Sequence, residues 1–249
     1  MLLLRNIRRK LISTENKFIT YLLYAIGEVI LVVVGILIAV NIDDWKNESQ
    51  NRKLEDKILR EISSNLSLDK EGIQEDIDLM KFMSRNCDSL LTYLNRYDEP
   101  PEVMKEIGVV LRGTPHFNPN LNGYKLLETK GVDILINDEL RNEISSLYEI
   151  WYTYYAKYEN ERVNYVLNIV KPKLVDYFNM SLNPDYYMKS EYNISSDDFR
   201  KMKSDEYFKK LIKAVKYENQ LVLLRATQLQ DEISGLETSI AKELEMRNN

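Results

Sequence analysis

The chain has 249 residues, of which 44% are hydrophobic and 29% charged, and its eight Gly and six Pro are typical of a helical protein and not of a disordered one. The first 42 residues carry five basic and two acidic side chains, so the formal net charge of −5 leaves −8 for the rest, which excludes the basic surface that nucleic-acid binding needs. Cys87 is the single cysteine, so no disulfide can form within the chain, and its helical spacing predicts a small buried hydrophobe.

Residues 1–17 form a short basic segment with leucines and isoleucines between the charges. This pattern predicts an amphipathic leader that lies on the inner surface of a lipid bilayer. The residues that follow the apolar segment 18–42 begin with Asp43 and Asp44 and contain no comparable basic cluster. The positive-inside rule therefore places the N-terminus in the cytoplasm.

Residues 18–42 are almost uninterruptedly apolar. At ~1.5 Å per residue this segment makes a helix of roughly 37 Å, which crosses the hydrocarbon core of a bilayer. A cleaved signal peptide would have a shorter apolar region and a small-x-small site, which residues 39–41, Ala-Val-Asn, do not provide. We therefore expect an uncleaved signal anchor, with residues 43–249 outside the cytoplasm.

A long helix is predicted from Asn47 to about Tyr97, because the segment has no proline and its apolar residues recur at helical steps. These residues are Leu54, Ile58, Ile62, Leu66, Ile73, Ile77, Met80, Cys87, Leu91 and Leu94. Pro100 and Pro101 end the helix, and a shorter helix follows to about Arg112. Residues 113–123, GTPHFNPNLNG, are the clearest loop of the chain.

A short helix is predicted over residues 124–130, and Gly131 ends it. The sequence VDILI at 132–136 alternates like a strand. Because no partner strand is evident, we interpret it as a connector.

Asn137 has the sequence signature of a helix cap, since two acidic residues follow it. The helix that it opens is predicted to run to about Val170, before Pro172. Ser195 is a weaker cap for a short helix, and Ser204 is predicted to begin the last helix.

The last helix has the most regular apolar pattern in the chain. Its apolar residues step mostly by alternating three and four, as in a coiled-coil seam: Val215, Val222, Ala226, Leu229, Ile233, Leu236, Ile240 and Leu244. The long helix after the membrane segment is the obvious antiparallel partner. The sequence thus predicts an all-α protein, with one transmembrane helix followed by an elongated, coiled-coil-like helical bundle over residues 43–249.

Glu28 is an ionisable residue near the centre of the membrane segment, where a charge costs roughly 2.5–3.5 kcal/mol. Tyr24, Glu28, Gly35 and Ala39 share one helix face, and Gly35 and Ala39 form a small-xxx-small step. This face predicts contact with another helix. Glu28 would be protonated and hydrogen-bonded there, or, in the sharper interpretation, would bind and release a proton or an ion.

Residues 148–165 contain seven aromatic side chains. Such residues at helical spacing usually fill a core, with their phenol groups at its edge. The alternative is an aromatic patch that binds a glycan or a protein partner through Tyr148, Trp151, Tyr152, Tyr155 and Tyr158.

The residues of common catalytic and metal sites are scarce. His116, in the loop, is the only histidine, and the sequence has no CxxC, HExxH, GxGxxG or phosphate-binding GxxxxGK[ST] motif. The many carboxylates of a chain with 29% charged residues are interpreted as solvated helix faces. We therefore expect no enzyme activity, no metal and no cofactor.

Residues 15–45, ENKFITYLLYAIGEVILVVVGILIAVNIDDW, resemble the N-terminal signature of an uncharacterised family of single-pass inner-membrane proteins of Gram-negative bacteria. Tyr24, Glu28, Gly35 and Trp45 match that signature, and residues 123–149 are similar more loosely. The resemblance implies an inner-membrane anchor and a periplasmic helical domain, and it implies no catalytic residue.

These features together predict an oligomeric scaffold or an accessory subunit of an envelope complex. Its partners would be the bilayer and either a second copy or another membrane protein. One alternative is a periplasmic sensor that binds a ligand or glycan through residues 113–123 or the aromatic patch. Another is an ion-coupled energy-transducing subunit that uses Glu28.

Overall fold

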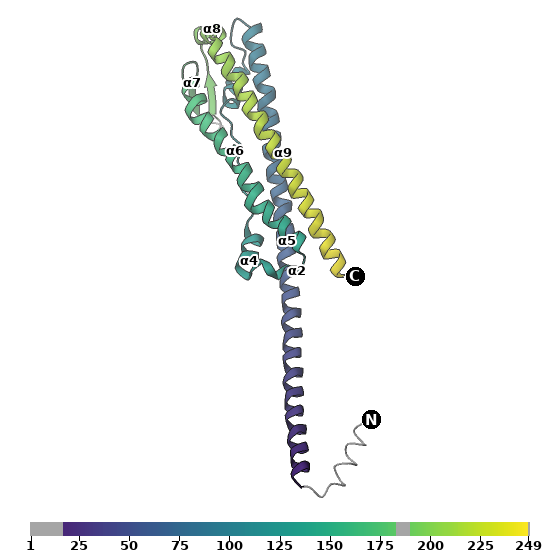
Figure 1. Ribbon diagram of the computed structural model, residues 1–249. Coiled ribbons are helices and arrows are strands. Elements are labelled where there is room, and N and C mark those ends of the chain that lie inside the picture. Colours follow the sequence, from purple (N-terminus) through teal and green to yellow (C-terminus); the bar gives the residue numbers. More distant parts are fainter. Residues whose placement is uncertain (1–16, 183–189, 249) are drawn as a thin grey trace. The chain divides into compact units, whose positions relative to one another are not determined.

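The computed structural model describes residues 17–182 and 190–248 (Figure 1). The chain divides into two compact units, Met1–Glu55 and Asp56–Asn249. The described elements are helical apart from one two-stranded hairpin, which confirms the all-α prediction. The predicted basic leader lies outside the described residues, except for Lys17.

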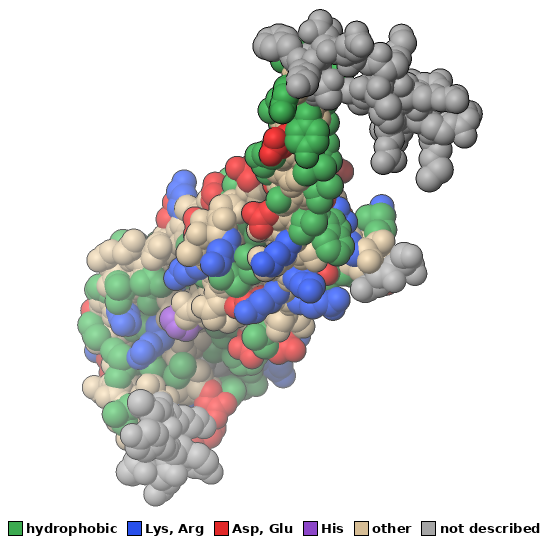
Figure 2. Space-filling model, turned by 90° about the horizontal axis from the view of Figure 1, so that it is seen from below, with side chains coloured by type: hydrophobic (Ala, Val, Ile, Leu, Met, Phe, Trp, Pro, Cys, Tyr) green, Lys and Arg blue, Asp and Glu red, His purple; other side chains and the backbone are tan. Residues whose placement is uncertain are grey.

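The first described helix, α2, covers Lys17–Arg96. Its described side chains from Tyr21 to Glu48 are all exposed, and hydrophobic side chains cover the surface of its first part (Figure 2). The segment is long and apolar enough to cross a membrane, as the sequence predicts.

In the second unit, the remainder of α2 packs antiparallel against α9, Glu206–Asn248. Three ion pairs show the direction and register: Lys216 to Asp88 at 2.7 Å, Lys70 to Glu237 at 3.1 Å and Arg247 to Asp56 at 3.0 Å. The seam residues of α9 are buried up to Ile240, and Leu244 is half-buried. This confirms the predicted antiparallel pair, in which each buried aliphatic side chain contributes roughly 1.5–3 kcal/mol.

A third long helical stretch completes the bundle, and it contains two π-helical segments. In order its parts are α5 (Asp138–Ser145), η2 (Ser146–Trp151), α6 (Tyr152–Tyr165), η3 (Val166–Val170) and α7 (Lys171–Leu174). Asn137 caps it as predicted, since its side chain accepts from the backbone N–H groups of Glu139 and Leu140 at 3.1 and 3.2 Å. Pro172 lies in its last turn.

The remaining elements are short. They are α3 (Met104–Val110), α4 (Asn122–Lys130), the 3₁₀ turn η1 (Val132–Ile134), α8 (Ser196–Ser204), β1 (Asn179–Leu182) and β2 (Ser190–Asn193). Gly131 ends α4 at a φ of 91°, which a residue with a side chain rarely adopts. The connector interpretation of residues 132–136 is confirmed by η1.

The β1–β2 hairpin was not predicted from the sequence. Its strands are antiparallel, with Met180 opposite Tyr192. Tyr192 is fully buried in a cluster with residues of α2, α3, α8 and α9, and its hydroxyl accepts a hydrogen bond from Arg112 at 3.0 Å. One strand residue therefore joins the hairpin to the helical core.

The predicted start of the last helix is corrected by one residue. Ser204 is the final residue of α8, and its hydroxyl donates to the carbonyl of Lys201. The cap of α9 is Asp205, whose Oδ1 accepts from the backbone N–H groups of Tyr207 and Phe208 at 2.8 and 3.1 Å. The positive end of the helix dipole also stabilises a carboxylate at this position.

Candidate functional site

Residues 113–123 are held along one face of α2 by side chains that accept backbone hydrogen bonds. Asn65, Asp69 and Asp76 share this face, because they are spaced i, i+4 and i+11. Asn65 accepts from the N–H of Gly123 at 3.0 Å, Asp69 from that of Asn120 at 2.8 Å and Asp76 from that of His116 at 2.9 Å. These bonds satisfy backbone donors that no secondary structure satisfies.

The two aspartates also accept hydrogen bonds from tyrosines of α6. Tyr152 donates to Oδ2 of Asp69 at 2.6 Å, and Tyr155 donates to Oδ2 of Asp76 at 2.8 Å. Burial raises the pKa of Asp69, although its hydrogen bonds oppose the shift. Burial and the adjacent carboxylates raise the pKa of both phenols strongly, so the tyrosines stay protonated as donors.

Glu159 of α6 completes the group that holds the loop, and we name Asn65, Asp69, Asp76 and Glu159 the loop clamp. Its Oε1 accepts from the N–H of Phe117 at 2.8 Å, and its carboxyl lies beside that of Asp76. Burial raises the pKa of Glu159 to about 7, and the charge of Asp76 adds to the shift. Protonated Glu159 is therefore populated near neutral pH.

Packing fixes the same loop between the hydrogen bonds. The Phe117 ring is 8% exposed and packs on Tyr152 and Tyr155, with ring centroids 5.6 and 5.9 Å apart. A Cβ on Gly123 would lie 2.8 Å from the backbone nitrogen of Ile62, so only glycine fits there. Among the side chains that stay exposed is His116, whose ring pairs with Asn118 at 3.2 Å.

The structure divides the predicted aromatic patch between the core and the surface. Tyr148, Tyr152 and Tyr155 are buried, and Tyr148 stacks on Tyr124 with ring centroids 4.5 Å apart. Trp151 and Tyr158 are half-buried.

Next to these two residues, the Arg225 guanidinium lies over the rings of Tyr154 and Tyr158, 5.2 and 4.9 Å from their centroids. Only the Trp151 and Tyr158 part of the predicted patch is therefore open to a partner.

The predicted helix-contact face lies in the first unit, on α2. Tyr24, Glu28, Gly35 and Ala39 are all exposed, and Tyr24 is 76% exposed. Their positions on a continuous helix put them on one side. The described chain therefore leaves this face open to a second helix.

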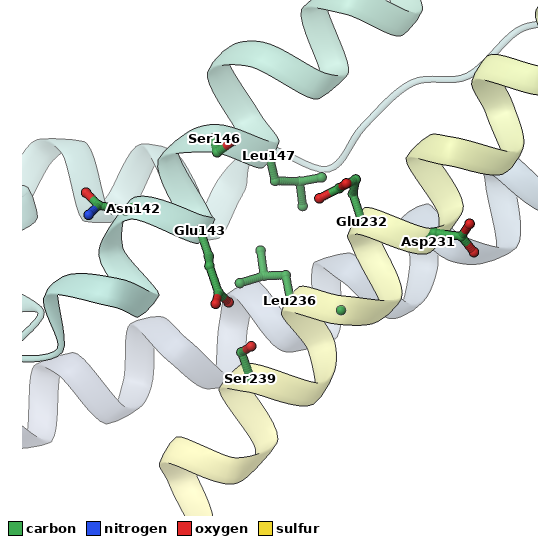
Figure 3. A pocket seen from close by; sticks show the side chains of 9 residues that line it. Asn142, Glu143, Ser146, Leu147, Asp231, Glu232, Leu236 and Ser239 are labelled. Carbon is green, nitrogen blue, oxygen red and sulfur yellow. The ribbon is translucent and has the colours of Figure 1, made fainter.

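A groove of about 490 Å³ lies between the α5–η2 stretch and α9 (Figure 3). Leu147 and Leu236 provide its apolar part, and in Figure 3 the side chains of Glu143 and Glu232 extend into the space between the helices. Its lining residues are Asn142, Glu143, Ser146, Leu147, Asp231, Glu232, Gly235, Leu236 and Ser239. This lining suits a partly apolar group that carries positive charge.

Within residues 17–182 and 190–248, no group of three or more His, Cys, Asp or Glu side chains is arranged to hold a metal ion. Comparisons with protein-family models, curated proteins and solved structures give no match to this chain. The features of the chain that can indicate its function are therefore the helix-contact face, the loop clamp and the groove.

The carboxylates of the loop clamp were missed when the acidic residues were interpreted as solvated faces. Their positions carried a signal, because Asp69 lies three residues after Leu66 and four before Ile73, inside the apolar seam. Asp76 follows Ile73 by three. Both aspartates are buried, as seam positions require.

Proposed function

We propose that this protein is a non-enzymatic, single-pass inner-membrane protein that serves as an oligomeric scaffold or as an accessory subunit of an envelope complex. The apolar, fully exposed first part of α2 supports the anchor. The second unit supplies a helical domain with its own core. We place this domain in the periplasm and the N-terminus in the cytoplasm, in line with the charge asymmetry around the anchor.

The observation that carries the proposal is the open face of Tyr24, Glu28, Gly35 and Ala39. A carboxyl at mid-membrane depth is costly unless another polar group meets it. Small residues on the same face let a second backbone approach closely. A second copy or another membrane protein would satisfy Glu28 and cover the face at once.

Substitution of Glu28 tests this face. We expect Glu28→Leu to weaken self-association or partner capture in native membranes by about 5- to 30-fold, the equivalent of a membrane hydrogen bond worth about 1–2 kcal/mol. Glu28→Gln keeps a hydrogen-bonding group and should assemble like the wild type. Ile30→Ala, on the opposite side of the helix, is the matched control.

Crosslinking in membranes, followed by purification and identification of what is captured, gives the measurement. Wild-type assembly by Glu28→Leu would contradict the proposal. If Glu28→Gln assembles normally and the captured complex loses proton- or ion-dependent activity, the ion-coupled subunit is the correct function instead.

A periplasmic ligand-binding module is the second candidate, and the groove between the α5–η2 stretch and α9 favours it. The loop at residues 113–123 and most of the aromatic patch favour it less, because their polar groups are engaged within the chain. Titration of the purified protein with cationic and glycan ligands discriminates the two functions. Saturable binding that Glu232→Gln weakens would support the module.

A further inference from the structure

Two neighbouring backbone N–H groups of the loop are bound by carboxyl groups from two different helices. His116 N–H donates to Asp76 of α2 at 2.9 Å, and Phe117 N–H donates to Glu159 of α6 at 2.8 Å. Because the two donors are adjacent in the chain, the two acceptor carboxyl groups are brought side by side. The contact thus ties the loop to both helices at a single point.

Among the described residues, the surroundings of the carboxyl pair supply no neutralising cation. Tyr155 donates to Asp76, and the exposed ring of His116 pairs with Asn118. On α6 the guanidinium of Arg162 contacts the Leu111 carbonyl, and from α9 Arg225 lies over Tyr154 and Tyr158. The buried Asp69, also on α2, adds a further carboxyl on the same face.

No Lys, Arg or His in the described parts of the chain forms an ion pair with Asp76 or Glu159. A proton on Glu159 therefore keeps two adjacent carboxyls, one buried and one half-buried, from repelling each other.

We propose that Asp76 and Glu159 form a proton-dependent latch, which fastens residues 113–123 to α2 and α6 while Glu159 holds its proton and releases them when that proton is lost. In the closed form, the protonated Glu159 carboxyl donates its O–H to Asp76, and each group still accepts one backbone N–H. Loss of the proton leaves two like charges side by side, and opening of the loop lets water reach both.

The direction of the pH effect follows from the two forms of Glu159. Its pKa is about 7 in the closed loop and returns to its ordinary value of 4.5 when the loop opens. The closed form therefore binds more protons between these values, and the opening equilibrium rises by up to about tenfold per pH unit in this window. Above the closed-form pKa the equilibrium becomes constant. The buried Asp69, whose pKa is also raised, acts in the same direction.

Hydrogen–deuterium exchange of the full chain in lipid nanodiscs tests the latch. We expect the protection factors of peptides covering residues 114–119, corrected for intrinsic exchange, to fall by at least about tenfold from pH 5 to pH 7 and to stay level up to pH 8. Glu159→Gln keeps the acceptor for Phe117 and cannot titrate, so its protection should vary much less. Glu161→Gln, an exposed neighbour on the same helix, should behave like the wild type.

A wild-type profile that is level from pH 5 to pH 7 overturns the latch without any variant. A parallel fall in Glu159→Gln, or an equal fall in the amides of α9, overturns it as well, since either would report another group or a global change. Asp76→Asn provides a second variant, because it removes the neighbouring charge and retains an acceptor. Its profile should also be flatter than that of the wild type.

Discussion

At the scale of single residues, the buried polar groups of the second unit differ sharply in how well they are satisfied. Asp69 and Asp76 each accept hydrogen bonds on both oxygens. Arg162 is 0% exposed and makes one long bond, at 3.4 Å to the carbonyl of Leu111, while its Nε and Nη1 have no partner among the described residues. Burial lowers its pKa to about 10, so it stays charged at neutral pH. A charge in this position costs stability.

Arg162→Met should therefore raise the stability of the protein. The methionine keeps an unbranched apolar stem and removes the buried charge, so we expect the free energy of unfolding to rise by about 1–3 kcal/mol. Urea unfolding followed by circular dichroism measures the change. Tyr155→Phe is the control of opposite sign, since it deprives Asp76 of a donor and should cost about 1–3 kcal/mol. A less stable Arg162→Met variant would contradict this account of the guanidinium.

At the scale of elements, local chemistry made some features predictable and hid others. Asn137 and Gly131 act through their own neighbours, so the cap and the helix stop were visible in the sequence. The π-helical segments η2 and η3 were not, because they change the hydrogen-bond register without a proline or glycine to mark it. Strand β1 was also hidden, since its four residues, Asn-Met-Ser-Leu, are too few for their alternation to be distinctive, and all four are exposed.

The Asn137 cap should contribute measurably to the second unit. Its side chain accepts from two backbone N–H groups and also donates to Glu243 of α9 at 2.8 Å. We expect Asn137→Ala to lower the free energy of unfolding by about 1–2 kcal/mol. Ser195→Ala removes a cap with one backbone bond and should cost less. Equal effects in thermal unfolding would show that the link to α9 adds nothing.

At the scale of the whole molecule, composition and periodicity predicted the helical class and the antiparallel α2–α9 pair, because both depend on long runs of regularly spaced residues. The way in which residues 113–123 are held in place could not be predicted from such regular spacing. Its fixation requires Asp76 and Glu159, which are 83 residues apart in the sequence and meet only through the packing of α2 and α6. The division of the aromatic patch between core and surface could not be predicted either, because the burial of each ring depends on which helices cover it.

The second unit should fold without the apolar first part of α2. Its described core lies within Asp56–Asn249, and α9 pairs with α2 from Asp56 onward through Arg247. We therefore expect a fragment of residues 47–249 to be soluble, helical and monodisperse, with a free energy of unfolding within about 1 kcal/mol of that of the same unit in the full chain, because the missing residues that the structure describes add no buried apolar side chain. Circular dichroism and analytical ultracentrifugation measure both properties. Non-cooperative unfolding or aggregation of the fragment would show that the helical domain needs the apolar first part of α2 to complete its core, and this segment would then be part of the fold.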